Sequence, residues 1–376
     1  MNRMSSANDE SESTAMTSRE IIRALTGEKT CLDRMGVFEE FWQDTQAEWE
    51  RQGLPPGVDL IEHFDHDFQP IQGSMFNTDP FLEEEEVLEA GGETLIRVNG
   101  WGARMRVWKD RPGVPEHLSF DMQDEEIWRS RYREPLLHLD LDRFSDLEGL
   151  RVNYAAAQAS DRFGYFYNIL PTEIMRRSMG DIVMLEAMCL NPDWVHDICS
   201  VVTDNLIRHL EYILSEVGLP DGVWMYEDMG YTQAPFFSPE MYREFLLPYH
   251  SKVGDFIHSY DLPFILHSCG RIRPLLPLIA QAGVDCLQAI EAKAGQSVME
   301  MADALDNSMA FMGNIDIRAF ESNDPRILEA EIIPKLEAVR QNRIPYIFHS
   351  DHSIPRSVRL ETYEYAMHLQ RTYGRY

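Results

Sequence analysis

Two residues whose side chains favour the same metal lie two positions apart in the second half of the chain, His267 and Cys269. They follow an apolar run, residues 262–266, that is typical of a buried β-strand. Because alternate residues of a strand point the same way, the imidazole and the thiol are expected to emerge together at the strand's carboxyl end. Zn²⁺ favours such a pair of nitrogen and sulfur ligands. A buried His-x-Cys pair is also common as simple core packing, so a zinc site requires a third ligand from elsewhere.

A second cluster of polar residues offers that ligand. Residues 344–348 form another apolar run with the composition of a buried strand, and His349, Ser350, Asp351 and His352 follow it directly. Two such clusters at strand ends in one chain favour a metal site over packing alone.

The elements that must position these clusters show a strand–helix rhythm from Arg162 onward. Helical segments separate the apolar runs, among them a long amphipathic helix that starts at residues 191–193 and a helix expected over residues 239–257. This alternation favours a (β/α)₈ TIM barrel. A doubly wound open sheet is the alternative, but the sequence has no G-x-G-x-x-G phosphate fingerprint. The predicted strands are residues 162–167, 223–226, 263–266, 284–289, 309–312 and 345–348.

The part of the chain before Arg162 is less regular. Residues 1–16 are polar and rich in Ser and acidic residues, which predicts a disordered tail, and residues 17–376 are expected to form one barrel domain with an N-terminal extension. A capping box at residues 17–20 predicts a helix, and residues 34–39 predict a first strand. Residues 86–110 alternate apolar and polar side chains around glycines, which predicts a β-ribbon that decorates the barrel. Residues 112–146 are polar and helical in character.

Composition restricts the partners and the compartment. The 376 residues include 34 Lys and Arg against 63 Asp and Glu, and the net charge of −29 argues against nucleic acid or an anionic membrane as partner. Five cysteines without framework spacing predict free thiols in a reducing compartment. The sequence has no apolar stretch of spanning length and no secretory signal, so a cytoplasmic location is expected.

In a barrel, functional side chains gather where strands end and loops begin. Glu227 and Asp228 follow one predicted strand and are candidates for catalysis. Each strand-end residue taken alone could simply cap a loop, and only their shared position favours a site. The candidates for binding substrate or cofactor are Tyr226, Gln288, Asn314, Asp316 and His349.

Four motifs now occur in a characteristic order: residues 238–249 (SPEMYREFLLPY), 267–270 (HSCG), 313–316 (GNID) and 351–355 (DHSIP). This succession resembles the uroporphyrinogen decarboxylase superfamily, which includes the decarboxylase of haem synthesis and the methylcobamide:thiol methyltransferases of corrinoid-dependent demethylation. The resemblance is strong in the C-terminal part of the chain and weak before Arg162. It implies a (β/α)₈ barrel with the site at its mouth.

The two branches of this superfamily make different demands. The decarboxylase grips a polyanionic porphyrinogen with an Arg-x-x-Gly-Arg-Tyr element after the first strand. The corresponding stretch here, residues 34–40 (RMGVFEE), lacks the second arginine and is acidic. The methyltransferases hold zinc with a His-x-Cys pair and a later cysteine. His267 and Cys269 match the pair, and His352 stands near the place of the later cysteine, with His349 in reserve; imidazole is also a good zinc ligand.

The resemblance therefore implies zinc-dependent methyl transfer between a corrinoid and a thiol or similar small acceptor. A zinc-bound thiol loses its proton and becomes the nucleophile. A methyl-corrinoid would be the co-substrate, held by a separate corrinoid carrier protein that docks over the barrel mouth. Glu227 or Asp228 would complete the coordination or take the thiol proton. The sequence leaves a homodimer open as the assembly.

Two other functions stay open. In a metal-free decarboxylase acting on a smaller carboxylate or a tetrapyrrole, Asp228 and His352 would stabilise charge at the reacting ring and Cys269 would be core packing. A non-catalytic barrel would bind a corrinoid or tetrapyrrole as a sensor or carrier. The set of His267, Cys269 and His352 and the missing arginine favour the methyltransferase.

Overall fold

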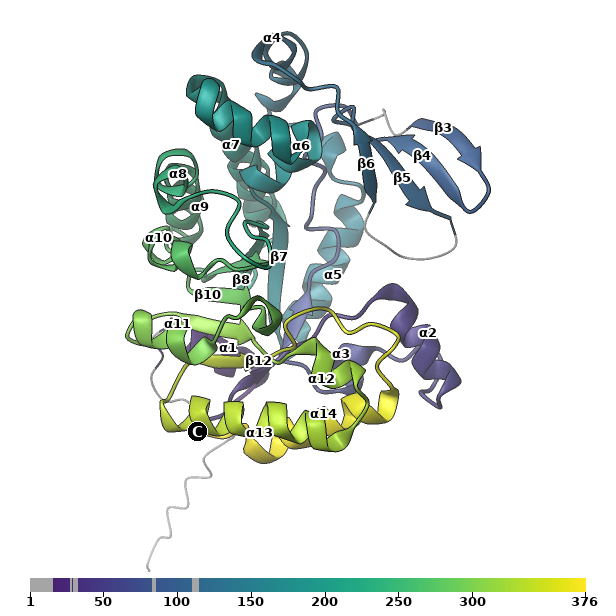
Figure 1. Ribbon diagram of the computed structural model, residues 1–376, viewed down its shortest axis with the longest axis vertical. Coiled ribbons are helices and arrows are strands. Elements are labelled where there is room, and N and C mark those ends of the chain that lie inside the picture. Colours follow the sequence, from purple (N-terminus) through teal and green to yellow (C-terminus); the bar gives the residue numbers. More distant parts are fainter. Residues whose placement is uncertain (1–15, 28, 30–32, 83–85, 110–114) are drawn as a thin grey trace, which may run out of the picture.

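The computed structural model describes residues 16–27, 29, 33–82, 86–109 and 115–376. Eight parallel strands form one sheet in the order β1-β12-β11-β10-β9-β8-β7-β2. Its two outer strands meet where the Asp67 N–H donates to the Val37 carbonyl at 2.8 Å, so the sheet curls into the expected (β/α)₈ barrel (Figure 1). The strands are β1 (Gly36–Val37), β2 (Phe68–Pro70), β7 (Phe163–Ile169), β8 (Gly222–Tyr226), β9 (Phe264–Ser268), β10 (Cys286–Ala289), β11 (Ala310–Gly313) and β12 (Tyr346–Phe348).

The strands predicted from Arg162 onward are confirmed, each within two residues of the expected bounds. β2 has no counterpart among the predicted strands, because three residues are too few to show a period and one of them is Pro70.

Helices cover the outside of the barrel. The long helix α7 buries one face, as its spacing predicts. The single helix expected over residues 239–257 is wrong, because the chain forms two helices that part at Leu246. Pro248 lacks an N–H and its ring crowds the carbonyl four residues earlier, which favours a break at this point. The main helices are α5 (Leu147–Ala159), α6 (Pro171–Leu190), α7 (Pro192–Glu216), α8 (Pro239–Phe245), α9 (Leu247–His258), α10 (Leu276–Gln281), α11 (Val298–Ala304), α12 (Ile317–Glu321), α13 (Pro325–Gln341) and α14 (Leu360–Tyr373).

Apolar side chains fill the inside of the barrel. These side chains form one buried cluster, which α1 (Ser18–Thr26) joins through Ile21, Ile22 and Leu25 to close the amino-terminal end of the barrel. The predicted capping box at Thr17 is confirmed. A barrel packed in this way is a core rather than a pore, which leaves the carboxyl end for a site. The strand and loop residues of the cluster include Phe38, Phe68, Phe163, Tyr165, Trp224, Ile265, Cys286, Met312 and Ile347.

The predicted β-ribbon is present as a separate antiparallel sheet of β3 (Glu86–Gly91), β4 (Thr94–Val98), β5 (Arg104–Trp108) and β6 (Glu116–Ser119). It lies to one side of the barrel, with β6 next to α6 (Figure 1). The helical character expected for residues 112–146 is wrong at β6, whose four residues are too few and too polar to show alternation.

Three further expectations concern the N-terminal tail, the cysteines and membrane-spanning helices. The predicted tail, apart from Met16, lies outside the described residues. The described cysteines, Cys189, Cys199, Cys269 and Cys286, are free thiols. None of the helices in the described part of the chain has the length and apolar character needed to cross a membrane.

Candidate metal centre

Asp228, His267 and Cys269 come together at the carboxyl ends of β8 and β9. His267 Nε2 lies 3.2 Å from Cys269 Sγ and 3.2 Å from Asp228 Oδ1. The ligand atoms of all three residues lie within 4.8 Å of one another, and among the described residues no other group of three or more His, Cys, Asp and Glu does so. A carboxylate, an imidazole and a thiol at this spacing can share one metal ion.

The register of the sheet explains why Asp228 joins the pair on β9. Tyr226 of β8 pairs with His267 of β9, so Asp228, two residues further on, falls opposite Cys269. The Cys269 N–H donates to Asp228 Oδ1 at 3.0 Å, which ties the two strand ends together. The same carboxylate oxygen therefore faces the imidazole and fixes the backbone that carries the thiol.

Opposing effects act on the protons of this cluster. Burial would raise the pKa of Asp228, but the hydrogen bond and charge of His267 outweigh it and lower that pKa. Burial would lower the pKa of His267, but Cys269 and Asp228 outweigh it and raise that pKa. Burial raises the pKa of the Cys269 thiol against the influence of His267. A divalent cation would replace the shared protons, because ligands bind metal in their deprotonated forms.

A row of hydrogen-bonded polar side chains orients the His267 ring from its Nδ1 side. His267 Nδ1 contacts Gln288 Oε1, and Gln288 Nε2 lies 3.4 Å from His349 Nε2. His349 Nδ1 donates to the Ser350 carbonyl at 2.5 Å, and burial lowers the pKa of His349 to about 4, so its Nε2 is an acceptor at neutral pH. Gln288 therefore donates to His349 and presents its oxygen to His267. In the neutral ring this places the proton on Nδ1 and leaves Nε2 free for a metal.

Glu39 is the last member of this row of polar side chains, beyond His349. Its Oε1 lies 3.4 Å from His349 Nε2, and it accepts hydrogen bonds from the Ser350 N–H at 2.9 Å and the Ser350 hydroxyl at 3.0 Å. Burial raises the pKa of Glu39 well above its usual range. Sequence reasoning missed this role of Glu39, although its position at the end of a predicted strand was an available signal.

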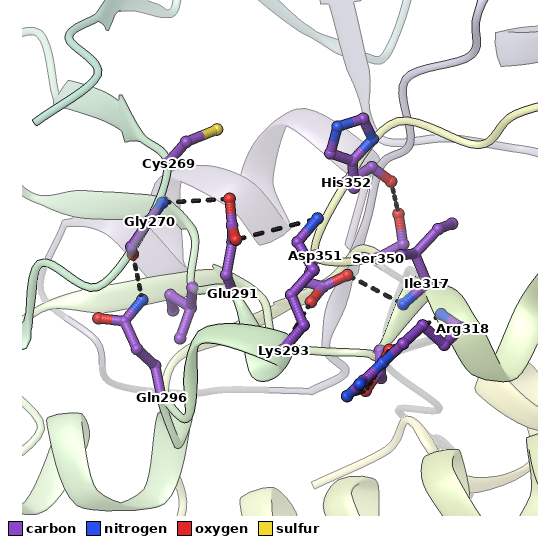
Figure 2. Close-up of polar contacts among 12 residues, drawn as sticks. Cys269, Gly270, Glu291, Lys293, Gln296, Ile317, Arg318, Ser350, Asp351 and His352 are labelled. Atoms are coloured by element: carbon purple, nitrogen blue, oxygen red, sulfur yellow. Dashed lines mark hydrogen bonds and ion pairs between the residues drawn. The ribbon is translucent and has the colours of Figure 1, made fainter. Parts of the chain in front are cut away.

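The structure does not bring His352 into the 4.8 Å group. Its ring stacks on Trp42, with centroids 6.1 Å apart, and its Nδ1 lies 3.2 Å from the Ser353 carbonyl. Figure 2 shows the Cys269 sulfur directed toward the side on which His352 lies. The role of His352 as a third ligand stays a prediction, and Asp228 occupies that place in the geometry.

Glu227 lies next to Asp228 but serves a different part of the fold. It is fully buried, and its carboxyl oxygens accept the N–H groups of Thr172 at 2.9 Å and Glu173 at 3.1 Å in the first turn of α6. His250 Nε2 lies 2.9 Å from the same carboxyl group. The first N–H groups of a helix lack partners within the helix, so Glu227 has a structural task here.

Other strand-end candidates also bind the loops. Asn314 accepts the Val298 N–H at 3.0 Å, and Asp316 caps α12 by accepting the Arg318 N–H at 2.9 Å. The Tyr226 hydroxyl donates to Glu40 at 3.0 Å while its ring lies 5.2 Å from that of His267. Of these residues, Tyr226 alone is placed beside the cluster.

A further set of contacts holds the loop that carries Cys269. The Gly270 N–H donates to Glu291 at 3.1 Å, and the Gly270 carbonyl accepts from Gln296 at 2.8 Å (Figure 2). Asp351 in turn accepts the Ile317 N–H at 2.9 Å. The loops at this end of the barrel are therefore fixed to one another around the cluster.

Fold and site together define a TIM-barrel protein with a candidate zinc centre at its carboxyl end. Residues 170–373, more than half of the chain, match the model of the uroporphyrinogen decarboxylase (URO-D) family, and the chain belongs to this family.

Two similar proteins come from Methanosarcina mazei. A methylated-thiol–coenzyme M methyltransferase is 36% identical over 86 residues, which are 23% of this chain and 22% of that relative, so the matched part spans about a fifth of its length. A solved structure of a methyltransferase has a TM-score of 0.64 and 13% identity and covers 95% of this chain and 99% of its own. At that identity the second likeness establishes the fold alone.

Proposed function

We propose that the protein is a zinc-dependent methyltransferase that moves a methyl group between a corrinoid and a thiol or a similar acceptor. The observation that carries this proposal is the convergence of Asp228, His267 and Cys269 within 4.8 Å at the barrel mouth. Three protein ligands leave a fourth position for an exogenous ligand, as catalytic zinc sites require. The URO-D family membership and the similarity to a methylated-thiol–coenzyme M methyltransferase support it.

The chain's own residues prepare the site for this reaction. Gln288 holds the His267 ring so that Nε2 faces Asp228 and Cys269, and Asp228 fixes the backbone of Cys269. Since Asp228 Oδ1 already faces both groups, its geometry suits a ligand better than a free base. When bound, zinc would lower the pKa of a thiol in the fourth position.

The transfer itself would proceed between the two substrates. The acceptor thiolate attacks the methyl carbon, the carbon–sulfur bond forms as the carbon–cobalt bond breaks, and the electron pair stays on the cobalt of the corrinoid. A separate carrier protein would present the corrinoid over the barrel mouth.

Metal analysis of protein purified without chelator tests the proposal. We expect close to one zinc per chain, lost in Cys269→Ser and retained in Cys189→Ser, because Cys189 is an exposed free thiol on α6. Less than about 0.3 zinc per chain, with no uptake of added zinc, would contradict it, since affinity at such sites is normally high.

An activity assay completes the test. The wild type should transfer the methyl group of methylcobalamin to a thiol, and Cys269→Ser should not. Unchanged turnover of a carboxylate or tetrapyrrole substrate in Cys269→Ser would instead support the metal-free decarboxylase.

A further inference from the structure

A cavity of about 1030 Å³ lies between the four-stranded sheet and α6 and extends to Asp228 of the candidate metal centre. One wall comes from β4, β5, β6 and Phe120, and the other from residues 173–183 at the start of α6. Figure 1 shows β6 beside α6. Asp228 lines the cavity and belongs to the metal cluster, so the cavity borders the cluster at this residue. This volume suits a ligand much larger than a two-carbon thiol.

Phe120 forms an aromatic surface at a break in α6. Gly180 has φ 75° and ψ 165° inside that helix, and a Cβ at this position would lie 2.4 Å from the ring of Phe120. Glycine is the residue that adopts this conformation without strain and leaves room for the ring. The His117 ring stacks on Phe120 with centroids 5.2 Å apart, and burial with the nearby Arg176 lowers the pKa of His117, so the pair is uncharged at neutral pH.

The arginines of α6 differ in how fully acidic groups neutralise them. Arg176 pairs with Glu173 at 3.0 Å and Asp181 at 2.9 Å, and its guanidinium lies over the Phe236 ring at 4.6 Å. Arg177 approaches Glu173 only to 3.6 Å, longer than a hydrogen bond, and its side chain is 46% exposed. Arg177 therefore has donors left for a ligand, and a guanidinium fits the planar geometry of a carboxylate in particular.

We propose that this cavity binds the small methyl substrate that exchanges its methyl group with the corrinoid, and that it selects an organic anion with an apolar body of ring size. The body lies against Phe120, and the anionic group pairs with Arg177. This assignment rests on the proposed function, because it takes the cluster of Asp228, His267 and Cys269 as the place of transfer. The sheet of β3–β6 then determines which substrate the barrel accepts.

Calorimetric titration with two matched probes tests the assignment. The probes are para-(methylthio)benzoate and para-(methylthio)benzyl alcohol, which share the ring and the thioether and differ in charge. Wild-type protein should bind the acid about 10-fold more tightly, because a bidentate charge-assisted pair contributes more than a neutral contact. Arg177→Gln should bind the two probes equally.

Arg129→Gln is the matched control. Arg129 has the same i,i+4 relation to an acidic residue, Glu125, and a similar exposed fraction of 55%, but it does not line the cavity. It should keep the full preference for the acid. Phe120→Ala should weaken both probes together and keep their ratio, because it removes the surface for the ring and leaves Arg177 in place.

Equal binding of acid and alcohol by the wild type, or an undiminished preference in Arg177→Gln, would overturn the assignment. These outcomes are separable from those of the proposed function. Protein that binds no zinc yet prefers the acid through Arg177 would contradict the proposed function and support the cavity as an anion site. Protein that binds zinc and transfers methyl groups without this preference would contradict the cavity assignment alone.

Discussion

Glu227 and Asp228 are adjacent acidic residues that follow the same strand, yet they lie in different environments. Glu227 is fully buried and binds the start of α6 and His250, whereas the Asp228 side chain is 35% exposed and faces His267, Cys269 and the cavity. The Glu227 N–H still bonds to the His267 carbonyl, so the strand pattern continues and consecutive side chains point to opposite sides. A carboxyl group at a strand end therefore marks a site only where the fold leaves part of its hydrogen-bonding capacity open.

The largest expected effect tests whether Glu227 has the structural role that its contacts indicate. We expect Glu227→Ala to lower the free energy of unfolding by about 3–5 kcal/mol, because removal of one partner leaves buried polar groups, here His250 and two helix N–H groups, without theirs. Urea unfolding measures this loss. Glu211→Ala, an exposed change on α7, should shift it by less than about 0.5 kcal/mol. A stable Glu227→Ala protein that has lost its zinc would reverse the roles of the two residues.

Asp228→Asn should affect zinc binding rather than the stability of the fold. The amide oxygen can still accept the Cys269 N–H, so the fold should remain, but zinc affinity should fall about 100-fold or more. The binding free energy of zinc at structural sites with four ligands is roughly 10–16 kcal/mol, so each ligand contributes about 3 kcal/mol. Competition with a zinc-binding dye measures the affinity. If Asp228→Asn binds zinc like the wild type while His352→Ala does not, the third ligand is His352.

Gln288→Leu tests a residue that orients the metal ligand His267 without being a ligand itself. Loss of the acceptor for His267 Nδ1 leaves the ring tautomer and orientation unfixed, and zinc affinity should drop about 10–100-fold. Gln281→Leu, an exposed change on α10, is the control and should have no effect. Unchanged affinity in Gln288→Leu would show that packing alone orients His267.

A second acid–histidine pair extends the comparison to an exposed position. His258 Nε2 lies 2.8 Å from Asp285 Oδ2 with its side chain 40% exposed, and the hydrogen bond to Asp285 raises the pKa of His258. A raised folded-state pKa stabilises the protein fully below the unfolded value of about 6.5 and ceases to do so as pH rises through the folded value. His258→Gln should therefore cost less than about 1 kcal/mol near pH 5.5 and almost nothing near pH 9. An equal loss in urea unfolding at both pH values would contradict this.

The sequence predicts most of the barrel because its strands and helices alternate with clear periods, and the neighbouring positions of His267 and Cys269 follow from strand alternation. It does not decide between Glu227 and Asp228, since that choice depends on where β8 ends relative to β9. The orientation of His352 depends on a loop packed against Trp42, which no local pattern encodes. Phe120 and Gly180 both line the cavity and pack together although they lie far apart in the chain, and no local sequence pattern predicts such a contact.

X-ray absorption at the zinc edge tests the central claim most directly. In zinc-loaded protein free of added thiol we predict one sulfur neighbour at about 2.3 Å together with nitrogen and oxygen neighbours at about 2.0–2.1 Å. Cys269→Ser should abolish the sulfur shell, while Cys189→Ser should leave it intact. A wild-type spectrum without sulfur, or a sulfur shell that survives Cys269→Ser, would contradict a metal centre built from Asp228, His267 and Cys269.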